Sequence, residues 1–303
     1  MSINCSTSTF EIGQLTSLFK LFSEHFEPHD KVLSKTYSEW LYLNNPFGPA
    51  KIVTATEKED GPWLGFLAMV PVYLARRDEI RTGYFVANVL VQRKQRGKNI
   101  FGMMIEKAME YVKTERAILM GHPNSMAYGA WQRAAMRFQP PLKSYFVSPK
   151  IIQWTTAVHR VRQVSGFEPF INVLNEQGRK SPEWQVVLSA DYLEWRYLRH
   201  PTNRYSLRAI NVKKDPVGFI VVKKIHASLN MLIDQFTLNG YMEASLGGAP
   251  WFTVAFLPEA LTRGCRRLWA VPTRKALSFF CTDYEKPIGG SEVMRLGLSA
   301  SDF

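Results

Sequence analysis

The residues whose types and spacing most favour chemistry are QRKQRGKN, at positions 92–99. Four cations surround one glycine in this stretch: Arg93, Lys94, Arg96 and Lys98 around Gly97. Glycine lets a ligand approach the backbone closely, and basic side chains compensate the charge of an anion. The stretch therefore predicts a phosphate-binding loop, with an ordinary solvated turn as the alternative.

The flanking segments are the elements that would position this loop. Residues 84–91 form a nearly continuous apolar run, which predicts a buried strand. Beyond the loop Asn99 stands at the position of a helix N-cap. The apolar residues that follow at helical spacing are Ile100, Met104, Ile105, Ala108, Met109 and Val112. Because the first amides of a helix lack partners within it, a phosphate is expected to bind there.

The stretch NVLVQRKQRGKNIFGMMIEKA, residues 88–108, resembles the acyl-CoA-binding segment of the GNAT (N-acetyltransferase) superfamily. Residues 121–138, GHPNSMAYGAWQRAAMRF, resemble the family's next element. The resemblance implies that the backbone of Val89, Leu90 and Val91 holds the pantetheine arm and the acyl carbonyl. It also implies a cofactor contact from Asn124 near the thiol end. The implied pyrophosphate loop consists of Arg96, Gly97, Lys98, Asn99, Ile100 and Phe101.

Three positions depart from the family's pattern. Asn99 stands in place of the second loop glycine, and Phe101 stands in place of the last loop Gly or Ala. Trp131 occupies the place of the tyrosine that protonates the leaving thiolate, and it has no acidic proton to give. These departures leave a catalytically inactive site as one of the alternatives.

Two residues are candidates for the acid–base chemistry of acyl transfer. Tyr128, one helical turn before Trp131, is the candidate acid. His122 follows the strand expected to run parallel to the cofactor strand, and histidine titrates near neutral pH, which suits a general base. A structural histidine beside a proline turn is the alternative. A further polar cluster, Glu24, His25 and Glu27, is interpreted as a solvated helix end.

A short motif occurs twice in the chain. YSEWLYLNNP (37–46) and YLEWRYLRHP (192–201) agree at six of ten positions, 155 residues apart. Two further pairs follow in the same order. Gly65-Phe66 is echoed by Gly218-Phe219, and AILMGHPNSMA (117–127) by RLWAVPTRKA (267–276), the latter pair predicting a strand, a proline and a helix start. Three echoes in one order favour an internal duplication, with Trp40 and Trp195 as core anchors.

These patterns together predict a mixed α/β fold of two tandem GNAT-like domains, each a central mixed β-sheet flanked by helices. Residues 1–165 would form the GNAT domain with the acyl-CoA-binding loop, and residues 166–303 a degenerate GNAT-like domain. The second copy of the central strand is expected at residues 229–236. No lysine or arginine lies between residues 225 and 262, so no second phosphate site is predicted.

Composition narrows the class of protein. Hydrophobic residues make up 46% of the chain, which supplies a packed core, and no stretch is apolar enough to predict a membrane span. The three cysteines have no zinc-ligand spacing, so neither a metal site nor a disulfide framework is expected. A reducing cytoplasm fits this usage, and no secretory signal is expected at the start. The net charge of +12 has no basic tail behind it, so a nucleic-acid partner is not favoured.

The leading hypothesis is an acyl-CoA-dependent N-acyltransferase, with acetyl-CoA as cofactor and a small-molecule amine or amino sugar as acceptor. One alternative is a FemAB-like transferase that uses aminoacyl-tRNA, for which the net charge of +12 speaks. The other is a catalytically inactive, acyl-CoA-binding pseudo-acetyltransferase, which Trp131 and Asn99 support.

Overall fold

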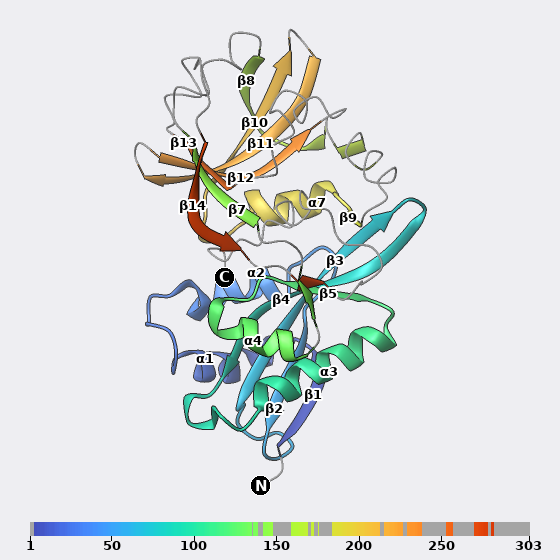
Figure 1. Cartoon of the computed structure of the whole chain (residues 1–303), viewed down its shortest axis with the longest axis vertical. Helices are drawn as coiled ribbons and strands as arrows, with labels where there is room; N and C mark the ends of the chain where they lie inside the picture. Colours follow the sequence, from blue (N-terminus) through green and yellow to red (C-terminus); the bar gives the residue numbers. More distant parts are fainter. Residues whose placement is uncertain are drawn as a thin grey trace.

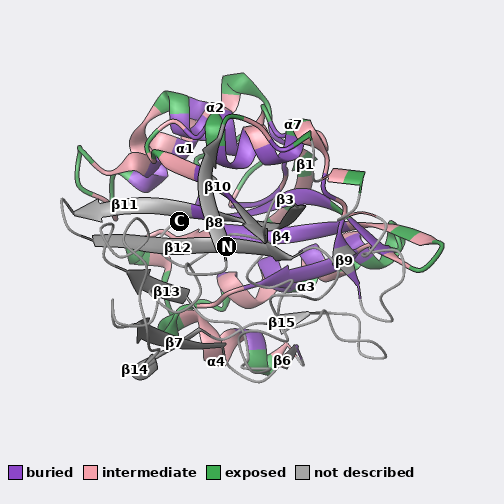
Figure 2. Cartoon of the chain, turned by 90° about the horizontal axis from the view of Figure 1, so that it is seen from above, coloured by how far each residue is buried: buried purple, intermediate pink, exposed green. Residues whose placement is uncertain are grey.

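The computed structural model contains two β-sheets, with α1 and α2 on one face of the first sheet and α3 and α4 on the other (Figures 1 and 2). The chain is thus of the mixed α/β class. The residues that the structure describes are 3–134, 136–138, 142–147, 159–168, 171–172, 175, 184–212, 215–226, 229–237, 253–256, 270–277 and 280–281.

The first sheet carries the predicted phosphate loop. In spatial order its strands are β1 (Asn4–Thr9), β2 (Lys51–Thr56), β3 (Gly65–Arg76), β4 (Glu79–Val91), β5 (Ile118–Gly121), β15 (Phe280–Cys281) and β6 (Arg137–Phe138). All neighbours are antiparallel except β4 and β5, which run parallel. The predicted parallel pair of strands around the loop is therefore confirmed.

Both faces of this sheet are covered, which explains the apolar runs in the sequence. Residues 65–72 of β3 are all buried, and alternate side chains belong to the two core clusters. The helices that cover the sheet are α1 (Leu15–Phe22), α2 (Lys35–Tyr42), α3 (Ile100–Thr114) and α4 (Ser125–Arg133). Short 3-10 helices η1 (Ile12–Gln14), η2 (Lys31–Leu33) and η3 (Arg93–Gln95) connect them. α3 lies so close to β3 that a Cβ on Gly65 would meet the Met104 sulfur at 2.9 Å.

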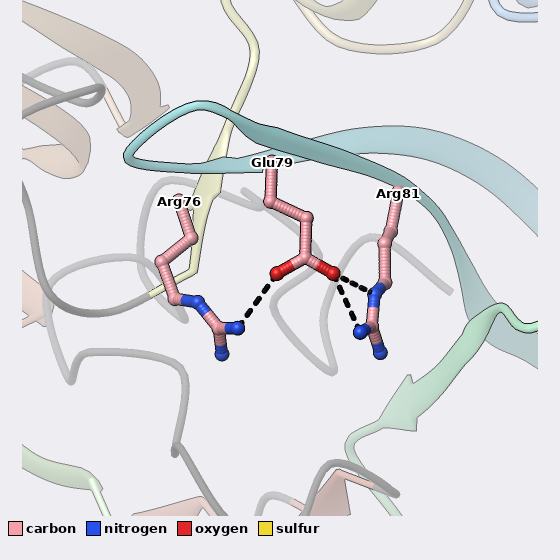
Figure 3. Close-up of polar contacts among 3 residues, drawn as sticks. All are labelled: Arg76, Glu79 and Arg81. Carbon is pink, nitrogen blue, oxygen red and sulfur yellow. Dashed lines mark hydrogen bonds and ion pairs between the residues drawn. The ribbon is translucent and has the colours of Figure 1, made fainter.

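The β3–β4 hairpin extends beyond the rest of the sheet, and its tip is held by charged groups (Figure 3). Glu79 accepts from Arg76 at 2.7 Å and from Arg81 at 2.5 Å. Both guanidinium groups also lie over the ring of Trp184, at 4.3 and 5.2 Å from its centroid. Trp184 immediately precedes β9 (Gln185–Val186), which pairs with β3. A segment from far along the chain thus covers the hairpin.

The second sheet contains strands from both halves of the sequence. Its order is β14 (Ala270–Leu277), β7 (Leu142–Val147), β13 (Thr253–Phe256), β12 (Leu229–Thr237), β11 (Asp215–His226), β10 (Tyr205–Val212) and β8 (His159–Val164). β7 precedes the predicted boundary at residues 165/166 yet lies in this sheet, while β15 follows it and lies in the first. The boundary itself stays a prediction, and strand pairing crosses it in both directions.

The hairpins that contain the second echo pair in matching register. Gly65 and Phe66 lie opposite Ala55 and Thr54, and Gly218 and Phe219 lie opposite Ile210 and Ala209. The copies are therefore offset by 155 positions on the first strand of each hairpin, as in the repeated motif, and by 153 positions on the second strand. A register shift also interrupts the next ladder of each sheet, between β3 and β4 and between β11 and β12.

The two copies of the repeated motif contact each other directly. The indole N–H of Trp40 donates to the carbonyl of Trp195 at 2.8 Å, and that of Trp195 donates to the carbonyl of Trp40 at 2.9 Å. The rings are stacked, with centroids 4.8 Å apart and planes at 19°. Both side chains are buried, which confirms the prediction of two core anchors. The sequence did not predict that each anchors the other.

The helix ends of the repeated motif differ between the copies. α2 ends at Tyr42, before Pro46, whereas α7 (Ala190–Leu193) continues as a π-helix over Glu194–Leu198. The third repeated pair predicted a helix start after Pro272. This prediction is wrong, because residues 273–276 continue strand β14. Among the described strands, β14 is the last of its sheet and pairs with β7 alone. A sheet tolerates proline at such an edge, and the register shifts directly after Pro272.

Candidate acyl-CoA site

The centre of the candidate site is a bulge in β4. Asn88 has a φ of 50°, and the ladder to β3 shifts its register between Ala87 and Leu90. Asparagine tolerates this left-handed conformation better than most residues. The side-chain amide of Asn88 donates to the Tyr42 hydroxyl at 2.7 Å, which ties the bulge to α2. Burial raises the pKa of the Tyr42 phenol, while the bond from Asn88 acts in the opposite direction.

β4 and β5 separate beside this bulge. Their parallel ladder covers Gly83–Phe85 of β4, whereas the antiparallel ladder to β3 continues to Val91. In the described part of the chain, backbone groups of β4 beyond Phe85 therefore lack a strand partner on the β5 side. Val89, Leu90 and Val91, the predicted pantetheine-binding residues, lie in this half-buried stretch. Such backbone donors and acceptors are available to an extended ligand.

The predicted phosphate loop follows β4 directly. η3 occupies its first part, and Gly97 has a φ of 85°, which glycine adopts at no steric cost. Asn99 precedes α3 with φ 56° and ψ 20°, so its predicted position at the helix start is confirmed. Its side chain makes no capping hydrogen bond, contrary to the N-cap role, because the left-handed backbone turns it toward Gly102.

The electrostatic character of the loop favours an anion. Arg93, Lys94, Arg96 and Lys98 are all exposed, and Lys98 donates to the side chain of Gln95 at 2.6 Å. Ile100, Phe101 and Gly102 begin α3, where amides lack partners within the helix. The helix dipole is positive at the same end. The described residues thus offer backbone donors and cations around one short turn.

The two aromatic departures from the family pattern pack against each other, Trp131 in the core and Phe101 half-buried against it. Phe101 packs edge-on against Trp131, with ring centroids 5.8 Å apart, among the residues that fill the space under α3. Trp131 is 1% exposed. The ring of Phe101 is therefore directed toward Trp131 on α4.

The remaining predicted residues lie after β5 and on α4. His122 directly follows β5, half-buried, with its ring 5.7 Å from that of Phe85 on β4. Asn124 caps α4 by accepting from the Ala127 amide at 2.9 Å. Tyr128 is half-buried against Phe138, with a centroid distance of 4.3 Å. These contacts place His122 beside β4, and they give Asn124 a structural role that the sequence did not predict.

The sequence also missed residues from the turn after α1. Glu24 accepts from the side chain of Gln92 at 2.8 Å, and Nδ1 of His25 lies 3.4 Å from Nη2 of Arg96. Glu24 and Glu27 are exposed, as expected of a solvated helix end, whereas His25 is half-buried and its Nε2 is buried. Burial and the two arginines Arg96 and Arg93 lower the pKa of His25. No local pattern predicts contacts between residues about 70 positions apart.

The described residues lack two other kinds of feature. No helix there is long and apolar enough to cross a membrane. No group of three histidine, cysteine, aspartate or glutamate side chains there is arranged to hold a metal ion.

Comparison with known proteins supports the fold and leaves the sequence family open. No protein-family model matches this chain, and no curated protein sequence matches it either. A probable N-acyltransferase structure from Enterococcus faecalis matches with a TM-score of 0.65 at 11% identity, over 92% of this chain and 72% of that one.

Two further solved structures match over similar lengths. A GCN5-related N-acetyltransferase from Anabaena variabilis gives a TM-score of 0.59 at 14% identity, over 92% of this chain and 72% of that one. Saccharomyces cerevisiae N-myristoyltransferase with bound myristoyl-CoA gives 0.54 at 12% identity, over 93% and 83%. At these identities the likeness concerns the fold alone. The chain has the fold of the GCN5-related N-acetyltransferases.

Proposed function

We propose that this chain is an acyl-CoA-dependent N-acyltransferase, with acetyl-CoA as donor and a small-molecule amine or an amino sugar as acceptor. The observation that carries the proposal is the succession of three features along β4 and its loop. The strand bulges at Asn88, separates from β5, and leads into a cationic loop at the start of α3. A ligand with an extended amide arm and a diphosphate matches these features in order.

The binding roles follow from this succession. The backbone of Val89, Leu90 and Val91 binds the pantetheine arm through groups on the β5 side, where no described strand pairs with them. The diphosphate accepts from the amides and side chains of the loop formed by Arg96, Gly97, Lys98, Asn99, Ile100 and Phe101. Phe101 contributes its amide while its ring packs against Trp131.

The catalytic roles are assigned to His122, which lies beside β4 at the end of β5, and to Tyr128 on α4. His122 takes a proton from the acceptor amine, whose nitrogen forms a bond to the acyl carbon. A backbone amide of the bulged stretch stabilises the oxyanion that develops. The carbon–sulfur bond then breaks, and Tyr128 gives a proton to the thiolate, since the buried Trp131 has none to give.

The first test is calorimetric titration of acetyl-CoA into the full chain, with Arg96→Glu and Lys113→Glu as variants. Both change the charge equally, but Lys113 lies in the last turn of α3, at the far end from the loop. We expect the wild type and Lys113→Glu to bind one equivalent and Arg96→Glu to lose it. Acetyl-CoA at a hundred times its Kd raises the free energy of unfolding by about 2.7 kcal/mol. Failure of the wild type to bind any acyl-CoA or free CoA contradicts the proposal.

A pseudo-acetyltransferase is the second candidate, favoured by the burial of Trp131 at the place of the family's acid. It predicts acyl-CoA binding without release of free thiol across a panel of amines. The same assay should be run with long-chain acyl-CoA donors such as myristoyl-CoA. Thiol release that depends on Tyr128 and His122 separates the enzyme from this candidate.

We further infer that the protein acts in the cytoplasm. We also infer that the second sheet is a degenerate copy of the first. The matched register of the two hairpins and the reciprocal tryptophan pair support the duplication. The matching structures also extend over both sheets, since they cover 92% of the chain. The absence of cations between residues 225 and 262 leaves the first copy as the one that binds the cofactor.

A further inference from the structure

The turn after α1 is joined to the phosphate loop by two side-chain contacts from consecutive residues. Glu24 accepts from Gln92, the first residue after β4, at 2.8 Å. His25 faces Arg96, with 3.4 Å between Nδ1 and Nη2. These contacts span 68 and 71 positions of the sequence, and they hold the start and the middle of the phosphate loop.

The contact with Arg96 determines which nitrogen of the neutral His25 ring carries the proton. A guanidinium group has donors and no acceptor, so Nδ1 must accept and cannot carry a proton. The proton of the neutral ring then sits on Nε2, which is buried. Around the ring stand Arg96 and Arg93 of the loop, Glu24 of the same turn and the backbone of Val91. Burial and the arginines lower the pKa of His25, while Glu24 and Val91 raise it.

Holding Arg96 in place matters because arginine is a long side chain with much rotational freedom. Ordering a free arginine on a phosphate costs conformational entropy at the moment of binding. Arg96 is exposed, so the protein core does not order it. The contact with His25 uses one of its five N–H donors and leaves the others for a ligand.

We propose that His25 is a positioning residue that holds the Arg96 guanidinium at the phosphate loop and thereby strengthens binding of the acyl-CoA diphosphate. The inference rests on the proposed function. It adds a residue that lies outside the family-like segment, on the opposite face of the sheet from α3.

The experiment measures the Kd of CoA by calorimetry for wild type, His25→Leu and His25→Asn, each also in an Arg96→Gln background. Leucine removes the acceptor, and we expect the Kd to rise about fivefold, as for a solvent-exposed hydrogen bond to a charged group. Asparagine offers an oxygen near the position of Nδ1 and should restore affinity. In the Arg96→Gln background, His25→Leu should have no further effect. Thermal unfolding checks that each variant is folded.

A pH series supplies a readout that a merely structural residue would not change. Because its pKa lies below the usual value of about 6.5, His25 is neutral at neutral pH and takes up a proton only as the pH falls further. Protonation removes the acceptor, so the Kd of the wild type should rise on acidification relative to that of His25→Asn. The ratio between the two proteins cancels the titration of the CoA phosphates.

Each other outcome overturns the inference. If wild type does not bind CoA, the proposed function fails and the inference fails with it. If wild type binds and His25→Leu binds equally well, the function stands and the inference alone is wrong. An equal penalty in both Arg96 backgrounds would mean that His25 acts on the fold in general. Tighter binding by the wild type on acidification, relative to His25→Asn, would make His25 a phosphate-binding cation.

Discussion

The reciprocal pair of Trp40 and Trp195 allows a quantitative test of what joins the two repeated motifs. Replacing Trp40 by phenylalanine removes its N–H and leaves the buried carbonyl of Trp195 without that donor. An unsatisfied buried carbonyl costs about 1–3 kcal/mol, and the smaller ring adds about 1 kcal/mol for the lost volume. We therefore expect the free energy of unfolding to fall by about 2–4 kcal/mol.

The geometry predicts the same cost for Trp195→Phe, because the second hydrogen bond, at 2.9 Å, is equivalent to the first. The two residues are 5% and 4% exposed, so neither change is relieved by solvent. Both substitutions act on one stacked pair, so the double variant should cost about 1 kcal/mol less than the sum, as residues in contact do.

Urea unfolding followed by far-UV circular dichroism measures these differences, with Trp63→Phe as control. Trp63 is half-buried and stacks on Phe66, so its replacement should cost less. Strands β7 and β15 lie in sheets formed mainly by the other half, so we expect one transition for the whole chain. A cost under 0.5 kcal/mol for either tryptophan, or full additivity, would refute the reasoning.

Two further predictions concern the candidate site. Gly97→Ala should lower the free energy of unfolding by about 1 kcal/mol, because alanine is strained at a φ of 85°, and it should also weaken CoA binding. Thermal unfolding and calorimetry measure the two effects. Gly13→Ala is the control, since nothing lies within 4 Å of the added Cβ and φ is not positive there. Tyr42→Phe should cost about 1 kcal/mol in urea unfolding, since the amide of Asn88 loses its acceptor, and an unchanged stability would show that the bulge does not depend on this bond.

The part of the site that is continuous in sequence was predictable. The apolar run before the loop, the glycine within it and the helical spacing after it each depend on local rules of backbone geometry. They predicted β4, the open turn at Gly97 and the buried face of α3, and the structure confirms all three. Asn99 shows the limit, because its type fits both a capping side chain and a left-handed backbone, and the structure has the second.

The contacts between distant residues were not predictable from these rules. His25 and Glu24 read as polar residues at a helix end, and their partners Arg96 and Gln92 are chosen by how α1 lies against the end of β4. The prediction of a helix start after Pro272 in β14 failed for a related reason. Its effect depends on whether the strand is central or at an edge, which is a property of the whole sheet.

The repeated motif shows how the two sheets divided their roles under the proposed duplication. Trp40 and Trp195 lie 155 positions apart and form the same bond in both directions, which is the pattern of a two-fold contact between equal partners. Under that duplication both copies carry a register shift beside the third strand, between β3 and β4 and between β11 and β12. The cations were kept in one copy alone, as clustered like charges repel each other unless an anion binds among them. On this reasoning the charge of the Arg93–Lys98 loop is itself an argument for a polyanionic ligand.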